Sequence, residues 1–266
     1  MSSSLPIVLA FAASDPTGGA GLQADLLTLA SLGCHPLSVL TGLTVQDTRG
    51  VESLLAIEPA WVERQARRVL ADIPVAVFKL GVLGSARNAQ IIASVLAEYP
   101  HTPVVLDPVL ASGRGDALAD AETIQILRSA LLPRTTVLTP NSLEVRRLTG
   151  AAQDADLAEC ARTLANLGCE HVLVTGTHEP GADVVNTLYN ARGMVREDRW
   201  QRLPGSYHGS GCTLAAAIAA LLAKGMAPVM AVQEAQRYTW QSLAAGFSPG
   251  KGQHLPNRFF AVRPEK

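Results

Sequence analysis

The stretch His208-Gly209-Ser210-Gly211-Cys212-Thr213 leads directly into an apolar run at residues 214–223. That run is apolar on every side, which predicts a helix buried in the core. Gly209 and Gly211 flank the start of this helix, where the first backbone N–H groups lack intrahelical partners, and these groups and the helix dipole attract anions. Cys212 lies in that field, which favours a thiolate over a thiol. The turn therefore predicts an anion site with an activatable cysteine, although such a cysteine can equally be a small buried hydrophobe.

Outward from this turn, short apolar segments alternate with helical ones along the chain. The expected strands are residues 6–12, 37–45, 75–80, 104–107, 137–139 and 171–174, with an antiparallel hairpin at 184–189 and 194–200. The expected helices are 21–32, 59–70, 86–99, 121–132, a short one from 141, 157–167, 212–224 and 229–245. This alternation predicts an α/β protein with helices on both faces of a mostly parallel sheet, as one domain over residues 1–266.

Composition excludes several classes of protein. The 266 residues are 48% hydrophobic and 17% charged, which is typical of a compact globular chain. A net charge of -1 gives no electrostatic reason to expect nucleic acid or an anionic membrane as a partner, and no apolar run reaches the length of a membrane span. The four cysteines form no C-x-x-C pair, so we expect a reducing, cytoplasmic location.

Ligands of parallel sheets bind beyond the carboxyl ends of the strands, which draws attention to the polar residues there. Asp107 and Glu144 follow successive expected strands, and two carboxylates suit Mg²⁺ held with waters and phosphates. Arg114 lies in a glycine-rich loop and could bind a phosphate with both ends of its guanidinium. His208 is either a base for Cys212 or a partner of the backbone. Asp25 faces the same cleft or is a solvated helix residue, and the residues alone favour the second interpretation.

The segment Gly19-Ala20-Gly21-Leu22-Gln23-Ala24 fits the dinucleotide fingerprint, so a nicotinamide enzyme is an alternative. Asp15 weakens this alternative, because it places a negative charge where pyrophosphate would bind. No Walker A sequence occurs in the chain.

Taken together, several motifs resemble the hydroxymethylpyrimidine/phosphomethylpyrimidine kinases of thiamin biosynthesis. The resemblance runs in order from Ile7 to about Gly252. Its motifs are Ser14-Asp15-Pro16-Thr17-Gly18-Gly19-Ala20-Gly21-Leu22-Gln23-Ala24-Asp25, Thr44-Val45-Gln46-Asp47-Thr48, Lys79-Leu80-Gly81-Val82-Leu83, Leu106-Asp107-Pro108-Val109, Leu138-Thr139-Pro140-Asn141 with Glu144, and the cysteine turn with Leu214.

This resemblance implies a ribokinase-like three-layer α/β/α fold and phosphorylation of a pyrimidine hydroxymethyl group, and then of its monophosphate, by ATP with Mg²⁺. It implies Cys212 as the base and the turn Gly209, Ser210 and Gly211 as the anion hole. The implied pyrimidine site is Gln46, Asp25, Gly21, Gly81 and Val109; the nucleotide site is Asn141, Thr175 and Arg114; and the metal site is Asp107 and Glu144. As partners we expect the pyrimidine and a second copy of the chain, in a homodimer.

Two departures from the family pattern concern the nucleotide phosphates. Thr175 stands where relatives commonly carry a lysine, and Arg114 takes the place of a lysine in the glycine-rich loop with a shift in position. Two other functions stay open: a pyridoxal kinase, since pyridoxal also presents a hydroxymethyl group on a nitrogen heterocycle, and a pyrimidine-binding protein without catalysis. Gln46 can donate and accept hydrogen bonds at once, which suits an aminopyrimidine edge.

Overall fold

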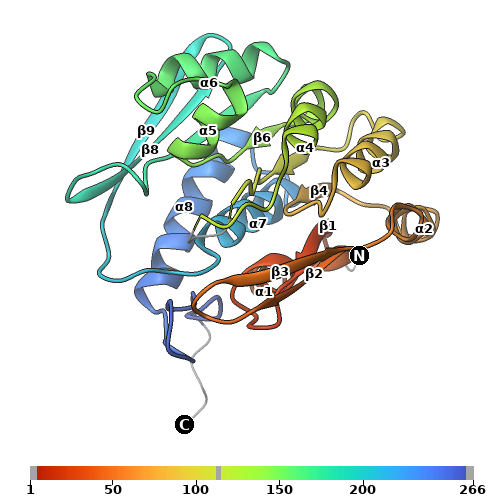
Figure 1. Ribbon diagram of the computed structural model, residues 1–266, viewed down its shortest axis with the longest axis horizontal. Helices are drawn as coiled ribbons and strands as arrows, with labels where there is room; N and C mark the ends of the chain where they lie inside the picture. Colours follow the sequence, from red (N-terminus) through yellow and green to blue (C-terminus); the bar gives the residue numbers. More distant parts are fainter. Residues whose placement is uncertain (1–4, 112–114, 262–266) are drawn as a thin grey trace.

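The computed structural model describes residues 5–111 and 115–261, and it contains one nine-stranded sheet with the order β3-β2-β1-β4-β5-β6-β7-β8-β9 (Figure 1). The strands are β1 (Ile7–Ser14), β2 (His35–Gln46), β3 (Val51–Ala56), β4 (Val77–Leu80), β5 (Val104–Leu106), β6 (Val137–Leu138), β7 (His171–Thr175), β8 (Asp183–Asn190) and β9 (Gly193–Gln201). Neighbouring strands from β2 to β7 pair in parallel, whereas β3, β8 and β9 join antiparallel. The mostly parallel sheet and the hairpin of β8 and β9 confirm the expected architecture.

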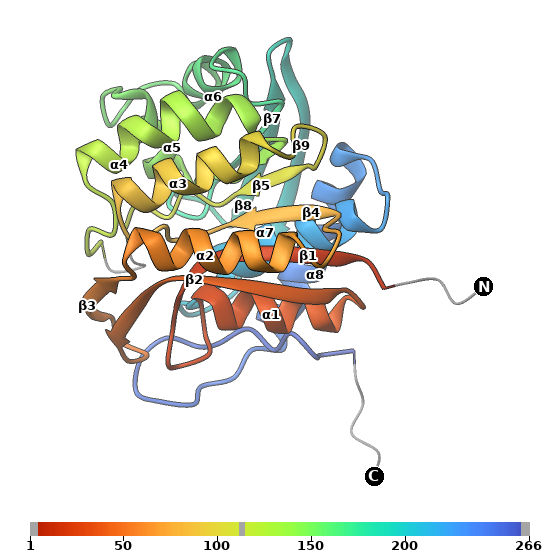
Figure 2. The same cartoon turned by 90° about the vertical axis from the view of Figure 1, so that its right-hand side faces the viewer.

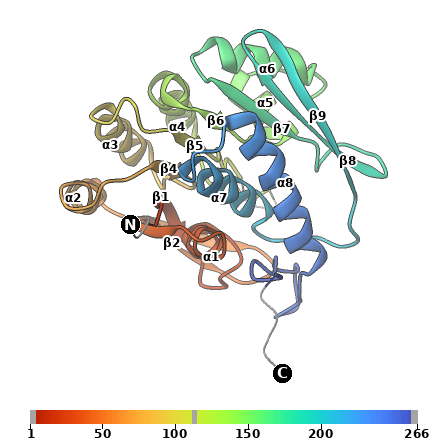
Figure 3. The same cartoon turned by 180° about the vertical axis from the view of Figure 1, so that it is seen from behind.

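Helices cover both faces of this sheet (Figure 2). They are α1 (Gly21–Ser31), α2 (Pro59–Leu70), α3 (Ala86–Ala97), α4 (Ala121–Ile126), α5 (Ser142–Thr149), α6 (Leu157–Asn166), α7 (Ser210–Ala223) and α8 (Pro228–Ala244). The larger apolar core lies between the sheet and the layer of α2 to α6, and a second core joins the opposite face to α1, α7 and α8 (Figure 3). No helix in the described residues has both the length and the apolar character required to cross a membrane.

Helix α7 is the buried helix that the sequence predicts. Every residue from Cys212 to Ala220 is buried, and the small alanine side chains bring its backbone close to the sheet and to α1 and α8. The helix begins at Ser210, two residues before the expected start, so Ser210 and Gly211 belong to its first turn.

Two expectations about the elements are wrong. Strand β3 had no predicted counterpart, because its alternating pattern is short and half exposed at the edge of the sheet. The helix expected over 121–132 is regular only to Ile126 and continues as a π-helical turn, Leu127–Leu131, and a 3₁₀ turn, Leu132–Arg134. Pro133 prevents a return to α-helix after the π-helical turn, since proline lacks the N–H that an α-helix requires.

Candidate functional site

The order of the strands places a ligand site beside β1 and β4. The chain fills the sheet outward from β1 to β3 and then in the opposite direction from β4, so β1 and β4 form the topological switch point. Ligands of open α/β sheets bind at such a point, beyond the carboxyl ends of the strands. Asp15 follows β1, Gly81 follows β4, and Asp107 follows β5.

The first turn of α7 presents unpaired donors at this end of the sheet. Gly209 is the N-cap with φ +82°, and its carbonyl oxygen accepts the first helical bond from the Thr213 N–H at 3.0 Å. In the described part of the chain, the N–H groups of Ser210, Gly211 and Cys212 have no acceptor. The helix dipole adds positive potential at the same place, so the turn has the geometry of an anion site.

A buried cation and two buried carboxylates surround Cys212. Lys79 and Asp25 are both fully buried, and Lys79 Nζ lies 2.8 Å from Asp25 Oδ1 and donates to Oδ2 at 2.9 Å. Asp107 follows β5 and shares a hydrogen bond with Cys212. The interpretation of Asp25 as a solvated helix residue is therefore wrong: its helix turns it into the sheet, where Lys79 neutralises its charge.

The expected thiolate at Cys212 is also wrong for this structure. Burial is the main cause that raises the pKa of Cys212, and the charges of Asp107 and Asp25 act in the same direction; Lys79 and the Gly21 N–H oppose them, and the net pKa is about 12. The free energy lost when the thiolate is removed from water exceeds the stabilisation that the helix N-terminus and Lys79 provide. The resting side chain is therefore a thiol. Helix position alone did not reveal that the Cys212 side chain is buried.

Glu144 and Asp107 are neighbouring buried acids. Glu144 Oε2 accepts from the Asn141 N–H at 2.9 Å and Oε1 from the Leu110 N–H at 3.2 Å. Burial and the charge of Asp107 raise the pKa of Glu144 to about 8, and burial also raises the pKa of Asp107. Asp107 Oδ2 is buried without a hydrogen-bond partner among the described residues. A Cβ on Gly211 would lie 3.7 Å from this oxygen, so the carboxylate borders the anion turn.

The loop between β1 and α1 packs directly against the anion turn. Asp15 accepts from the Thr17 N–H at 2.8 Å and the Ala20 N–H at 2.7 Å, and His208 Nε2 lies 2.8 Å from its Oδ2. Burial raises the pKa of Asp15, but the bonds from His208 and the loop outweigh it and the net shift is downward. His208 therefore pairs with Asp15, which is neither of the roles expected for it.

The expected nucleotide residues meet at the ends of β6 and β7. Asn141 and Thr175 face each other in a β-bridge, and the Thr175 N–H donates to the Pro140 carbonyl at 2.9 Å. The Gly176 N–H donates to Asn186 Oδ1, and Asn186 in turn donates to Gln236. This buried chain of bonds fixes the segment that carries Thr175. Arg114 lies outside the described residues.

The residues expected at the pyrimidine divide into two groups. Gly21 and Gly81 lie at the switch point with Asp25, and Val109 is half-buried beyond Asp107. A Cβ on Gly81 would approach Lys79 Nζ to 2.9 Å, which explains the glycine there. Gln46 instead lines a pocket of about 450 Å³ between the β2–β3 hairpin, the β1–α1 loop and the tail at Gly250 and Lys251.

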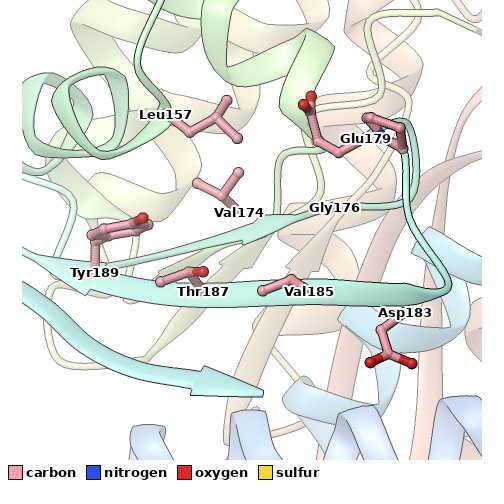
Figure 4. Close-up of a pocket in the computed structure, with 9 residues that line it drawn as sticks. Leu157, Val174, Gly176, Glu179, Asp183, Val185, Thr187 and Tyr189 are labelled. Carbon is pink, nitrogen blue, oxygen red and sulfur yellow. The ribbon is translucent and has the colours of Figure 1, made fainter. Parts of the chain in front are cut away.

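A smaller pocket of about 130 Å³ lies beside Gly176 (Figure 4). Leu157, Val174, Thr187 and Tyr189 line it, and Leu157, Val174 and Tyr189 belong to the core on the α2–α6 face of the sheet. Cys212 is on the opposite face with α7, so this pocket is separate from the anion turn.

Lys79 is the functional residue that the sequence reasoning missed. Its signal was a lysine near the end of the apolar strand at 75–80, because a charged residue inside a buried strand requires a partner.

Comparison with known proteins identifies the family. A sequence profile described as phosphomethylpyrimidine kinase matches residues 15–257. The chain belongs to this family. It is 41% identical over 253 residues to the hydroxymethylpyrimidine/phosphomethylpyrimidine kinase of Streptomyces coelicolor, with 93% of this chain and 92% of that protein aligned. It is 40% identical to a thiamine biosynthesis bifunctional protein of Geobacter sulfurreducens; the alignment takes in 96% of this chain but 52% of that longer protein.

A solved structure confirms the ribokinase-like fold. The pyridoxal kinase of Staphylococcus aureus, in complex with AMP-PCP and pyridoxal, superposes with a TM-score of 0.87 at 26% identity. The superposition takes in 96% of this chain and 94% of the other. The three-layer architecture expected from the sequence is thus the fold of a kinase that holds an ATP analogue.

Proposed function

We propose that this chain transfers the γ-phosphoryl group of ATP to the hydroxymethyl oxygen of 4-amino-5-hydroxymethyl-2-methylpyrimidine, and then phosphorylates the resulting monophosphate. The observation that carries the proposal is the first turn of α7, whose unpaired N–H groups border the buried carboxylate of Asp107 at the switch point. Phosphoryl transfer depends on positioning and charge neutralisation, which such a turn supplies. The family and its relatives' names support the substrate class.

Each site residue has a role in this proposal. Gln46 binds the pyrimidine edge from the larger pocket, and Gly21, Gly81 and Val109 shape the floor around it. Asp25 holds Lys79 beside Cys212 and is the innermost group of the pyrimidine site. Asn141, Thr175 and Arg114 contact the nucleotide. The N–H groups at Ser210, Gly211 and Cys212, with Gly209 as N-cap, hold the transferred phosphoryl group.

Cys212 accepts the proton of the attacking hydroxyl group. Its thiol must first give its proton to Asp107, the carboxylate that shares a hydrogen bond with it, and Lys79 is a charged side chain that favours the resulting thiolate. Asp107 opposes ionisation through its negative charge. The balance between these two neighbours therefore controls how much thiolate is present when the hydroxyl group arrives.

The residues fit a divalent cation such as Mg²⁺. Asp107 offers an oxygen without a hydrogen-bond partner, and each Glu144 oxygen keeps a second lone pair beside the one that accepts an N–H. In the described ranges no group of three or more acidic, histidine or cysteine side chains is arranged for a metal, which suits an ion that keeps waters and phosphates as its other ligands. When bound, the cation would neutralise the carboxylate charge that opposes the Cys212 thiolate.

A pyridoxal kinase is the second candidate, because the superposition on the Staphylococcus aureus enzyme is close over most of both chains. The two candidates share the anion turn and differ in the heterocycle that Gln46 must recognise.

We also propose a cytoplasmic homodimer. All four cysteines are free and buried, which suits a reducing compartment. Leu43, Val45 and Leu55 lie on one face of the β2–β3 hairpin and are exposed, and a second copy of this face would cover them.

A coupled assay of ADP release tests the function. With ATP and Mg²⁺, we expect turnover with the hydroxymethylpyrimidine and with its monophosphate, and at least tenfold lower kcat/KM with pyridoxal. Faster turnover with pyridoxal would establish the second candidate. Calorimetric binding of the pyrimidine without any ADP release would instead establish a binding protein that lacks catalysis.

A further inference from the structure

Arg258 is a buried cation that joins two loops of the site from the far end of the chain. Its Nε donates to Thr213 Oγ1 at 3.1 Å, and its two terminal nitrogens donate to the carbonyl oxygens of Gly18 and Gly19. Gly18 and Gly19 belong to the β1–α1 loop, whereas Thr213 belongs to the first turn of α7. One guanidinium group therefore contacts both the β1–α1 loop and the first turn of α7. These two segments form walls of the site proposed for the phosphoryl acceptor, the pyrimidine, which is called the acceptor site below.

The β1–α1 loop and the N-terminus of α7 are packed in direct contact. A Cβ on Gly209 would lie 1.8 Å from the Gly19 carbonyl oxygen, and a Cβ on Gly19 would lie 2.6 Å from the His208 ring. Thr213 Oγ1 accepts from Arg258 and donates to the Gly209 carbonyl at 2.8 Å. Arg258 thus acts on the N-cap of α7 through Thr213, and on the facing loop directly.

The tail that carries Arg258 is itself tied to the rest of the site. The Gly252 N–H donates to Thr48 Oγ1 at 3.0 Å and the Gln253 N–H to the Thr48 carbonyl at 2.8 Å, at the tip of the β2–β3 hairpin. The His208 N–H donates to the His254 carbonyl at 2.9 Å. These bonds fix the position of the tail that carries Arg258. The tail therefore contacts the β2–β3 hairpin, the segment before α7 and the β1–α1 loop.

The guanidinium of Arg258 is a planar group with several N–H donors, so it can bind acceptors on both segments at once. Among the described residues it forms no ion pair within 4.0 Å, and its partners are two backbone carbonyls and a hydroxyl group. Lysine would present a point charge and could not span the same three acceptors. Arg258 also lies one residue beyond the segment that the family profile matches.

We propose that Arg258 is a positioning residue that holds the β1–α1 loop against the anion turn and so fixes the N–H groups of Ser210, Gly211 and Cys212. Its effect on turnover rests on the proposed phosphoryl transfer, but its effect on the turn does not.

Hydrogen exchange on the full chain without ligands tests the positioning role. In Arg258→Met we expect the amides of residues 18–20 and of residue 213, which are hydrogen-bonded in the unaltered chain, to exchange at least tenfold faster, while amides of the central strands β1 and β4 keep their rates. Thr213→Val removes one of the three acceptors with little change of shape, and it should speed exchange at residue 213 alone. Arg237→Met is the matched control, because Arg237 is an exposed arginine paired with Glu234 on α8. Unchanged exchange at both loops, or equal acceleration throughout the sheet, would overturn the proposal.

Kinetics with ATP and the pyrimidine give the second measurement. We expect Arg258→Met to lower kcat about 10- to 100-fold with little change in the KM for ATP, because Asn141 and Thr175 lie at the ends of β6 and β7 and are not among the hydrogen-bond partners of Arg258. Arg258→Lys should recover less than half of the loss. A kcat equal to that of Arg237→Met, with altered exchange, would overturn the catalytic consequence. A wild-type chain without kinase activity would refute the proposed function while the exchange result still decides the role of Arg258.

Discussion

At Cys212, ionisable neighbours act on the thiol in opposite directions. Burial and the charges of Asp107 and Asp25 raise its pKa to about 12, and Lys79 lowers it. Asp25 also holds Lys79 in place, so the same carboxylate that opposes the thiolate anchors the cation that favours it. A helix N-terminus contributes only a partial charge, whereas burial removes the hydration of a full one. Burial, more than the helix dipole, therefore governs the protonation of this cysteine, and Lys79 is the neighbouring charge that opposes it.

Substitution of Cys212 tests its role as the base. Loss of a general base costs about 10²–10⁴ in rate, so Cys212→Ala should lower kcat by that factor. Cys212→Asp should retain more activity than Cys212→Ala, because a carboxylate can also accept the proton. The pyrimidine should still bind, since the N–H groups of the turn remain, and calorimetry would show this. Cys160→Ala is the matched control at another buried thiol; a Cys212→Ala enzyme as active as this control would make Cys212 structural.

Substitution of Gln46 tests recognition of the heterocycle. Gln46→Ala leaves polar atoms of the pyrimidine without a partner, which costs about 1–3 kcal/mol, or roughly 5- to 150-fold in affinity. The KM for the pyrimidine should rise accordingly while the KM for ATP stays constant. Gln153→Ala, at an exposed glutamine, provides the control. An unchanged pyrimidine KM would remove Gln46 from the site.

At the scale of elements, the N-terminus of α5 serves both structure and chemistry. Asn141 and Glu144 form a capping box, in which the Asn141 side chain accepts from the Glu144 N–H and Glu144 accepts from the Asn141 N–H. The same Glu144 is buried against the charge of Asp107. A carboxylate that takes part in a capping box is held rigidly, because the helix itself depends on its orientation, and this suits the metal role proposed for Glu144.

The raised pKa of Glu144 predicts a dependence of stability on pH. Its pKa is about 8 in the folded chain and about 4.5 when unfolded, so the folded state binds more protons between these values. The free energy of unfolding should therefore fall as the pH rises from 5 to 8, measured by urea unfolding without metal. Added Mg²⁺ should stabilise the chain more at pH 8 than at pH 5, because it compensates the ionised pair. Glu144→Gln should flatten the pH slope, and an equal slope in this variant would contradict the assignment.

The sequence predicted most elements because buried strands and amphipathic helices leave patterns along a single segment. It missed β3, whose half-exposed alternation depends on pairing with β2, and it missed the partner of Asp25. Lys79 is 54 positions away from Asp25, and the contact exists only once β4 lies beside β1. Motifs predicted which loops meet at the switch point. The protonation of Cys212 and the contacts of Arg258 depend on burial and on the path of the tail, which no local pattern encodes.

At the scale of the whole molecule, the β2–β3 hairpin is the edge at which we propose that a second copy binds. Leu43 and Leu55 are direct cross-strand partners, and Val45 lies on the same face two residues along. Their exposed fractions are 44%, 65% and 55%, on a hairpin whose tip also forms one wall of the Gln46 pocket. A two-fold dimer through this face would cover all three side chains in both copies. It would also restrict the motion of the hairpin tip that lines the Gln46 pocket.

Substitution on this hairpin tests the dimer and its link to the site. Burial of a leucine side chain contributes about 1.5–3 kcal/mol, and a two-fold interface counts it in both copies, so Leu55→Glu should weaken the dimer by roughly 100-fold or more. Sedimentation equilibrium should then show monomers at micromolar concentration, where we expect the unaltered chain to be dimeric. Met194→Glu, at an exposed apolar residue on the opposite edge strand β9, should leave the dimer intact. Because the hairpin tip lines the Gln46 pocket, the Leu55→Glu monomer should also show a higher KM for the pyrimidine and an unchanged KM for ATP. A monomeric unaltered chain would refute the dimer, and a dimer that survives Leu55→Glu would place its interface elsewhere.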